Sequence, residues 1–217
     1  MKLVTVTAPT EEPVSLDDAK AQVSIIDDTS HDARLLRLIK AARLQAEAHT
    51  GMRALTQTVR LELDTFPSSR SDVGRWEAEM ISVSRNEYRG FRSHGAIDLG
   101  VYPVQSITSV QYDDTNGVQQ TLALNTDYYA DISGMVPRIL PVDSWPDTKD
   151  GKPGCVRITM VVGHASADLV PEDFSQAVLM RLAELFDQTT ETVQGTITSQ
   201  TSVGFELLLA PHRRMVV

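Results

Sequence analysis

The chain has 217 residues, of which 41% are hydrophobic and only 6% aromatic. Its length lies between one typical domain and two, and Leu, Val, Ile and Ala must supply the core. The formal net charge is −9, and the 20 basic residues are scattered among 29 acidic ones. The sequence therefore lacks the basic stripe with which most proteins bind duplex DNA.

No apolar run is long enough to cross a membrane, and the N-terminus has no signal-peptide pattern. The single cysteine, Cys155, excludes an internal disulfide framework and a multi-cysteine zinc site. We therefore expect a soluble intracellular protein that does not contact a membrane.

Two helices are predicted near the N-terminus. Ser15 and Asp18 have the spacing of a capping box, which begins a short helix. A longer helix starts at Asp28 or Ser30 and ends at Gly51, a residue that suits a left-handed C-terminal cap. Its apolar residues recur every three or four positions and predict a buried stripe, at Leu35, Leu38, Ile39, Ala42 and Ala46. Four basic residues lie off this stripe and are expected in solvent: Arg34, Arg37, Lys40 and Arg43.

From residue 56 the period changes to two, because Val59, Leu61 and Leu63 alternate with polar residues, which predicts a half-buried strand. Together with the later strands, this predicts an antiparallel β-domain over residues 56–165. The sequence around Asn116 and Gly117 predicts a turn between two strands. The best strand covers residues 156–162, where β-branched side chains predominate. Residues 68–95 show no clear period and are predicted to form a long hairpin or loop.

A further helix is predicted after Pro171, within residues 166–189, and residues 190–202 have the polar composition of a flexible linker. Because helices and strands are segregated along the chain, the predicted class is α+β. In this architecture the helices of residues 1–55 form a small bundle with the C-terminal helix. The β-domain is inserted between them, and residues 203–217 form an extended C-terminal tail.

The residues that most often carry chemistry do not form a recognisable site. The five histidines form no HExxH, and no CxxC, GxSxG, GxGxxG or Walker-type motif occurs. We therefore predict no catalytic residues, no cofactor and no metal, and hence no enzyme. The alternative is a small hydrolase or nuclease in which His164 acts with Asp131 or Asp168. It requires a converging acid–base cluster, and a histidine after a strand is more often an ordinary loop residue.

The C-terminal tail combines an apolar anchor with a basic end, formed by Phe205, Leu207, Leu208, Leu209, Pro211, Arg213 and Arg214. One interpretation is insertion into a partner protein, by strand addition or by apolar knobs. Burial of its four large apolar side chains is worth about 6–10 kcal/mol before ordering costs. The other interpretation is that the tail folds back on its own domain, for example as an edge strand.

Six segments have recognisable sequences: PVSLDDAK at 13–20, EAHTG at 47–51, PVQSITSVQY at 103–112, DYY with RI at 127–139, VPEDF at 170–174 and LLAPHRR at 208–214. In this order they resemble the head-tail connector (adaptor) proteins of tailed bacteriophages and related prophages. The chain departs from that family at His49 and His212, which replace an aromatic residue. It also has an additional Met52 and a longer segment at 68–95.

The resemblance implies a structural protein of the virion neck that assembles in the host cytoplasm. Twelve copies would form a ring below the portal protein, and a stopper or tail-terminator protein would follow. The nearest structural alternative is another neck component, such as a stopper or tail-completion protein. DNA would pass through the channel without sequence-specific binding, and an acidic wall suits this because it repels DNA. The tail, with the seven residues from Phe205 to Arg214 named above, would dock onto the portal.

Overall fold

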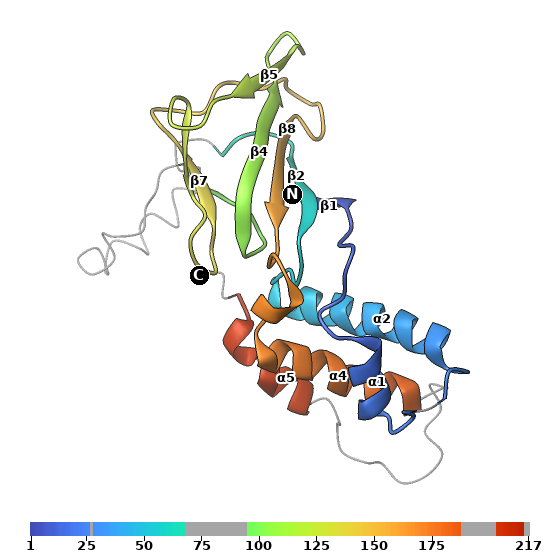
Figure 1. The fold of residues 1–217 in the computed structure, drawn as a ribbon. Coiled ribbons are helices and arrows are strands. Elements are labelled where there is room, and N and C mark those ends of the chain that lie inside the picture. The colour runs from blue at the N-terminus through green and yellow to red at the C-terminus, as the bar shows by residue number, and fades with distance from the viewer. Residues whose placement is uncertain (27, 68–94, 188–202, 215–217) are drawn as a thin grey trace, which may run out of the picture.

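The computed structural model describes residues 1–26, 28–67, 95–187 and 203–214. Strands form one part of the molecule, the β-part, and helices form the other, the helical part (Figure 1). The predicted α+β class is thereby confirmed. The predicted linker at 190–202 lies outside the described residues, as does all but the last residue of the predicted hairpin or loop at 68–95.

Within the described residues, the helical part contains four α-helices and two short 3-10 helices: α1 (Leu16–Gln22), α2 (Asp32–Thr50), α4 (Glu172–Asp187), α5 (Val203–Leu209), η2 (Ala167–Leu169) and η3 (Ala210–His212). The predicted capping box is present, because the Ser15 hydroxyl accepts the Asp18 amide and the Asp18 carboxylate accepts the Ser15 amide. Gly51 ends α2 with a φ of 77°, as predicted. The start of α2 is later than predicted, because the Asp28 carboxylate binds the amide and hydroxyl of Ser30 in the preceding turn.

The helical core lies between α2, α4, α1 and α5. The predicted stripe of α2 is buried, except that Leu38 is partly exposed. The expectation that Arg43 is solvated was wrong, because its side chain is only 2% exposed. Its guanidinium donates to the carboxylate of Glu12 at 2.6 Å and to that of Glu47 at 3.1 Å. Glu12 lies 31 residues away, so the helical spacing of α2 did not reveal this pair.

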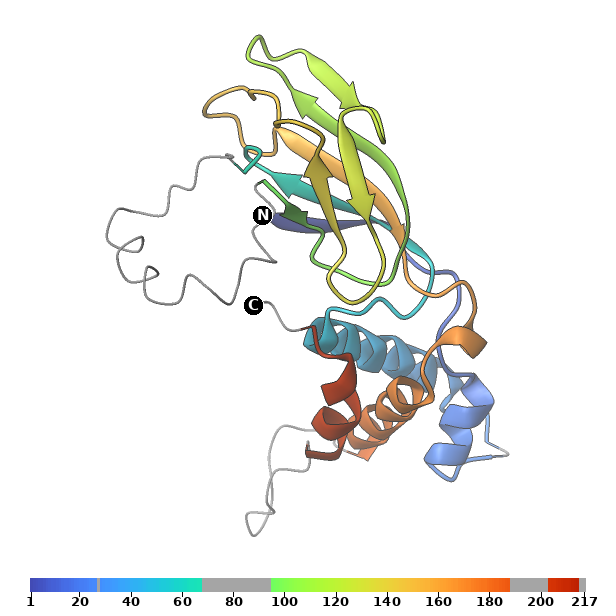
Figure 2. The same cartoon turned by 90° about the vertical axis from the view of Figure 1, so that its left-hand side faces the viewer.

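The β-part consists of two antiparallel sheets that pack face to face (Figure 2). The larger sheet has the order β1 (Lys2–Thr7), β2 (Gln57–Leu63), β8 (Val156–Val162), β4 (Val104–Asp113) and β5 (Gln119–Leu122). The smaller sheet has the order β3 (Ile97–Asp98), β7 (Arg138–Pro141) and β6 (Tyr128–Asp131). Alternate residues of β2 and β8 are buried between the sheets and form a second core with residues such as Leu99 and Ile139.

Two predictions about the ends of the chain require correction. Residues 1–55 were assigned to the helical part, but β1 joins the larger sheet as an edge strand. Most of its side chains are exposed, so its sequence carries no clear alternation of buried and exposed positions. The C-terminal tail was predicted to be extended, but residues 203–212 form α5 and η3. A four-residue step from Phe205 to Leu209 places both on one helix face, which is buried.

The helical and β-parts are joined at the C-terminal end of α2 by the carboxylate of Glu47, which is 1% exposed. It accepts hydrogen bonds from the guanidinium of Arg43 at 3.1 Å and from that of Arg53 at 2.9 Å. The backbone amide of Ala54, in the connection to β2, donates to it at 3.1 Å. Because these donors bind one buried carboxylate, they fix the direction in which the chain leaves α2.

Replacing Glu47 tests this junction. Glu47→Ala is expected to lower the free energy of unfolding by about 3–5 kcal/mol, because two guanidinium groups lose a buried partner. Glu11→Ala is the control, since Glu11 is exposed, and its effect should stay within about 0.5 kcal/mol. Urea denaturation followed by circular dichroism measures both values. Equal effects of the two substitutions would contradict the role assigned to Glu47.

Gly163, after β8, gives a second test of the same junction. Its φ is +95°, and a Cβ atom there would lie 2.1 Å from the carbonyl oxygen of Leu55. Gly163→Ala is therefore expected to cost about 3 kcal/mol or more, from backbone strain and overlap together. Gly134 has a φ of +81° with no atom within 4 Å of such a Cβ, so Gly134→Ala should cost only about 1 kcal/mol. Thermal and urea unfolding of the two variants give the comparison.

Candidate functional site

The C-terminal segment, residues 203–214, is the candidate site because its sequence predicted partner binding. It lies along α4 and below the end of α2, and then runs toward the smaller sheet (Figures 1 and 2). The segment therefore contacts both parts of the molecule. Of the two interpretations left open by the sequence, the structure shows the segment folded back on its own chain, as a helix and not as an edge strand.

Three of the seven predicted residues form the buried face of this segment. Leu209 is fully buried and Phe205 is 9% exposed, both in the helical core, and Leu208 packs partly against them. The Phe205 ring also lies beside the imidazole of His49 in α2, with 6.1 Å between the ring centroids. These side chains hold α5 against α4 and α2, so they are not free to contact a partner in this conformation.

The other face of the segment is exposed to solvent. Leu207 is 72% exposed, and Pro211 and Arg213 are also exposed. Leu207 lies two residues from both Phe205 and Leu209, so the helical geometry directs it away from the core. The exposed side chains of Leu207, Pro211 and Arg213 are together named the exposed tail face below.

A polar clamp holds the end of the segment at the start of α4. The imidazole Nε2 of His212 lies 2.7 Å from both carboxylate oxygens of Asp173. The hydroxyl of Tyr102 donates to the backbone carbonyl of His212. Burial raises the pKa of Tyr102 to about 12, so this hydroxyl keeps its proton at neutral pH and remains a donor.

Arg214 completes the clamp at the junction with the β-part. Its backbone amide donates to the carbonyl of Thr50 at 2.9 Å, and its guanidinium pairs with the carboxylate of Asp98 in β3. The Arg214 side chain is only 10% exposed. Burial lowers the pKa of its guanidinium, which nevertheless stays charged because an arginine starts from a pKa above 12. The seventh predicted residue is thus an internal ion-pair partner.

Sequence reasoning missed the four residues that receive the segment, which are Thr50, Asp98, Tyr102 and Asp173. They are far from it along the chain, and no spacing rule connects them to it. One signal could have indicated three of them. Thr50 and Asp173 belong to two of the six segments that carry the family resemblance, and Tyr102 directly precedes a third. The structure brings these segments together with LLAPHRR at one junction.

The enzyme alternative gains no support from the geometry around His164. Its imidazole Nε2 is buried without a hydrogen-bond partner, and within the described ranges no carboxylate is bonded to it. Burial, with a further contribution from His212, lowers the pKa of His164. Asp131 instead pairs with Arg138 and accepts a hydrogen bond from Ser133. A histidine without a carboxylate partner does not form the acid–base pair that this alternative needs.

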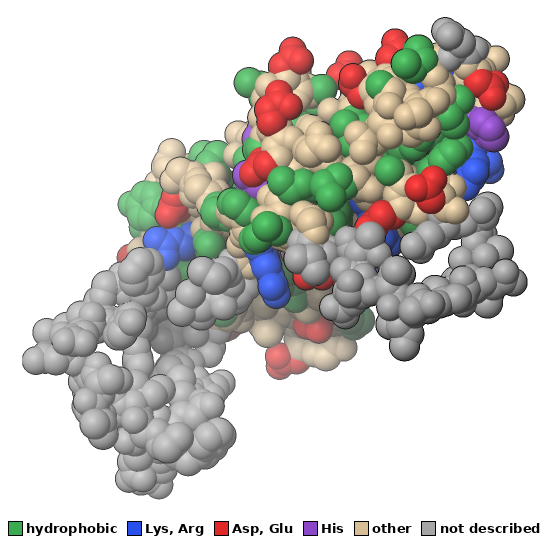
Figure 3. All heavy atoms as spheres, turned by 90° about the horizontal axis from the view of Figure 1, so that it is seen from below, with side chains coloured by type: hydrophobic (Ala, Val, Ile, Leu, Met, Phe, Trp, Pro, Cys, Tyr) green, Lys and Arg blue, Asp and Glu red, His purple; other side chains and the backbone are tan. Residues whose placement is uncertain are grey.

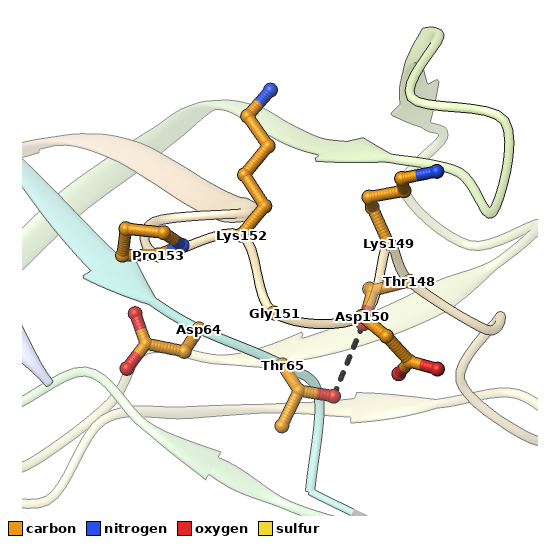
Figure 4. Close-up of a pocket in the computed structure, with 8 residues that line it drawn as sticks. All are labelled: Asp64, Thr65, Thr148, Lys149, Asp150, Gly151, Lys152 and Pro153. Carbon is orange, nitrogen blue, oxygen red and sulfur yellow. Dashed lines mark hydrogen bonds between the residues drawn. The ribbon is translucent and has the colours of Figure 1, made fainter.

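A hollow of about 380 Å³ lies in the loops of the β-part, between the end of β2 and residues 148–153 (Figure 4). Its two lysines extend away from Asp64 and Thr65, not into the hollow. Lys152 pairs with Asp113 at 2.5 Å, and Lys149 donates to the carbonyl of Thr115 at 3.2 Å. Both ammonium groups therefore already have partners in the chain.

Two negative findings apply to the part of the chain that the structure describes. Within it, no three His, Cys, Asp or Glu side chains are grouped as metal ligands would be. None of its helices has the length and the apolar character needed to cross a membrane.

A leucine-to-alanine substitution is expected to lower the free energy of unfolding by different amounts on the two faces of the segment. Leu209→Ala is expected to lower the free energy of unfolding by about 2–5 kcal/mol, because it opens a cavity in the helical core. Leu207→Ala, two residues earlier, should change it by about 0.5 kcal/mol or less, because that side chain is in solvent. Urea denaturation measures both. A small effect of Leu209→Ala would show that the segment does not pack on its own chain.

Comparisons with known proteins identify structural relatives only. No protein-family model matches the chain, and no curated protein matches it in sequence. Its structure is similar to a chain in the virion of a native gene transfer agent particle, with a TM-score of 0.73 and 20% identity. Chains from the neck of the empty particle, computed with C6 symmetry, and from the neck of the native particle, computed with C12 symmetry, give TM-scores of 0.71 and 0.68 at 21% identity. Each likeness covers 100% of this chain and 97% of the other, so this protein shares its whole fold with chains of gene transfer agent particles.

Proposed function

We propose that this protein is a structural head-to-tail adaptor in the neck of a tailed phage or a related phage-like particle. The observation that carries the proposal is the likeness in fold to neck chains, which extends over the entire chain. The six sequence segments that resemble connector proteins support it independently. Three of them, EAHTG, VPEDF and LLAPHRR, meet at one junction of the structure, and Tyr102, which directly precedes a fourth, also binds there.

In this proposal several copies, twelve by the family resemblance, form a ring around the DNA channel. The neck structures of the related particle were computed with C6 and C12 symmetry, which supports a rotationally symmetric arrangement. The net charge of −9 suits a channel wall, because like charge keeps DNA from adhering. The ring would assemble on the portal in the host cytoplasm and offer its other side to a stopper or tail-terminator protein.

We assign portal docking to the exposed tail face. A leucine that is 72% exposed beside a proline and an arginine supplies apolar area together with positive charge. Such a combination suits an apolar pocket with an acidic rim. Phe205, Leu208, Leu209 and Arg214, which the sequence had grouped with these residues, then act indirectly by fixing the position of the segment.

Co-sedimentation with assembled portal rings of the same particle tests this assignment. Leu207→Asp combined with Arg213→Glu is expected to weaken binding at least about tenfold, because it removes an apolar anchor and reverses a charge. Leu124→Asp is the matched control, since Leu124 is 51% exposed but lies in the β-part. It should bind as the unchanged protein does. Unimpaired binding of the double variant would rule out the exposed tail face, and failure of the unchanged protein to bind would rule out the adaptor role.

A further inference from the structure

The outer side of α2 carries an exposed stripe with both apolar and basic residues. Leu36 and Leu44 are 52% and 47% exposed, and Arg37 and Lys40 lie between them, also exposed. Steps of three and four residues place these four side chains on one helix face. The two leucines are separated by about 12 Å along the axis at the rise of an α-helix. This set is named the α2 stripe below.

The two basic residues of the α2 stripe differ from the other arginines of α2 in their partners within the chain. Arg43 is buried against Glu12 and Glu47, and Arg34 donates to the backbone carbonyl of Phe186 at 2.7 Å. Within the described ranges, Arg37 and Lys40 form no ion pair. Their charges, next to two exposed leucines, are therefore available to a partner.

A groove with acidic residues in its lining lies between the start of α1, η2 and the first half of α4. Its volume is about 470 Å³. Its lining includes four acidic residues and an apolar floor: Glu12, Asp18, Asp168 and Glu172, with Pro13, Val14, Val170 and Leu179. Glu12 already pairs with Arg43, and Asp18 belongs to the capping box. In the described part of the chain, Asp168 and Glu172 have no ion-pair partner. This hollow is named the α1–α4 groove below.

The stripe and the groove belong to different surfaces of the helical part. α1, α2 and α4 pack against one another, and the four stripe residues of α2 are exposed and do not line the groove of the same molecule. The view from below shows acidic side chains at several places along the upper edge of the molecule (Figure 3). One molecule therefore cannot bring its own stripe into its own groove.

We propose that the α2 stripe of one copy docks into the α1–α4 groove of the next copy. Leu36 and Leu44 contact the apolar floor, and Arg37 and Lys40 face Asp168 and Glu172. The occupant is a second copy of this chain because the same chain carries both complementary surfaces. Such a head-to-tail contact is heterologous, and repeated contacts of this kind close into a ring when the rotation between copies fits. The inference rests on the proposed function and specifies which surfaces join neighbouring copies.

Cross-linking of the full chain tests the head-to-tail geometry. Leu36→Cys and Gln176→Cys place one thiol on the stripe and one at the groove, and the native Cys155 is buried and unreactive. With a short bismaleimide, the protein carrying both substitutions should give a ladder of covalent oligomers, alone or on portal rings. Each single variant should stay monomeric, and an equal mixture of the two should give dimers only. A dimer from Leu36→Cys alone would overturn the proposal, because it indicates a two-fold contact between stripes.

Charge reversal tests the electrostatic contribution to the proposed contact between the α2 stripe and the α1–α4 groove. Lys40→Glu, added to the double-cysteine protein, should lower the yield of cross-linked oligomers at least about tenfold, because it sets like charges against each other. Lys2→Glu, at an exposed lysine of β1, is the matched control and should leave the yield unchanged. The yield of the parent protein should also fall with rising salt. An unchanged yield from Lys40→Glu would overturn the assigned contact.

Portal co-sedimentation separates this inference from the proposed function. If the unchanged protein binds portal but the double-cysteine variant gives no ladder on it, the contact between copies is wrong and the adaptor role stands. If the unchanged protein does not bind portal at all, the adaptor role itself fails. A ladder that requires both cysteines and disappears with Lys40→Glu supports the stripe and the groove.

Discussion

The carboxylate of Glu47 is the interaction on which the arrangement of the two parts depends. It is buried where α2 ends, and it binds guanidinium groups on both sides of the left-handed turn at Gly51. A single buried carboxylate without these donors would be strongly unfavourable, so the helix end and the following chain must keep their positions together. The backbone amide of Ala54 is fixed by the same carboxylate, and β2 starts three residues later. The end of α2 therefore determines the orientation of the larger sheet.

The C-terminal segment closes the same junction from the other side. Its backbone binds the carbonyl of Thr50 and its side chains reach Asp98 in the smaller sheet and Asp173 in α4. These contacts link the last described residues to three elements that are otherwise separate in the sequence. A segment anchored in this way presents its remaining side chains in a fixed orientation, which reduces the ordering cost when a partner binds. In the proposed docking, the anchoring residues would thus contribute to binding without touching the partner.

The sequence predicted what depends on local patterns. The capping box at Ser15, the end of α2 at Gly51 and the strand β8 follow from spacing and residue type, and the α+β class follows from the order of helices and strands. The burial of Arg43 was missed, because it depends on Glu12, which approaches only in three dimensions. The same reason applies to the C-terminal segment. Its apolar cluster was recognised, but the division into buried and exposed faces requires its helix and the surface of α4.

The first turn of α4 connects the two surfaces proposed for binding. Asp173 holds His212 and thereby the C-terminal segment, and the preceding residue, Glu172, lines the groove proposed for the neighbouring copy. Phe174, the next residue, is fully buried and fixes this turn in the helical core. A shift of the turn would therefore move the exposed tail face and the groove together. Because packed cores do not deform continuously, a rigid first turn keeps the surface proposed for the portal and the surface proposed for the neighbouring copy in one geometric relation, as the proposed ring on a portal requires.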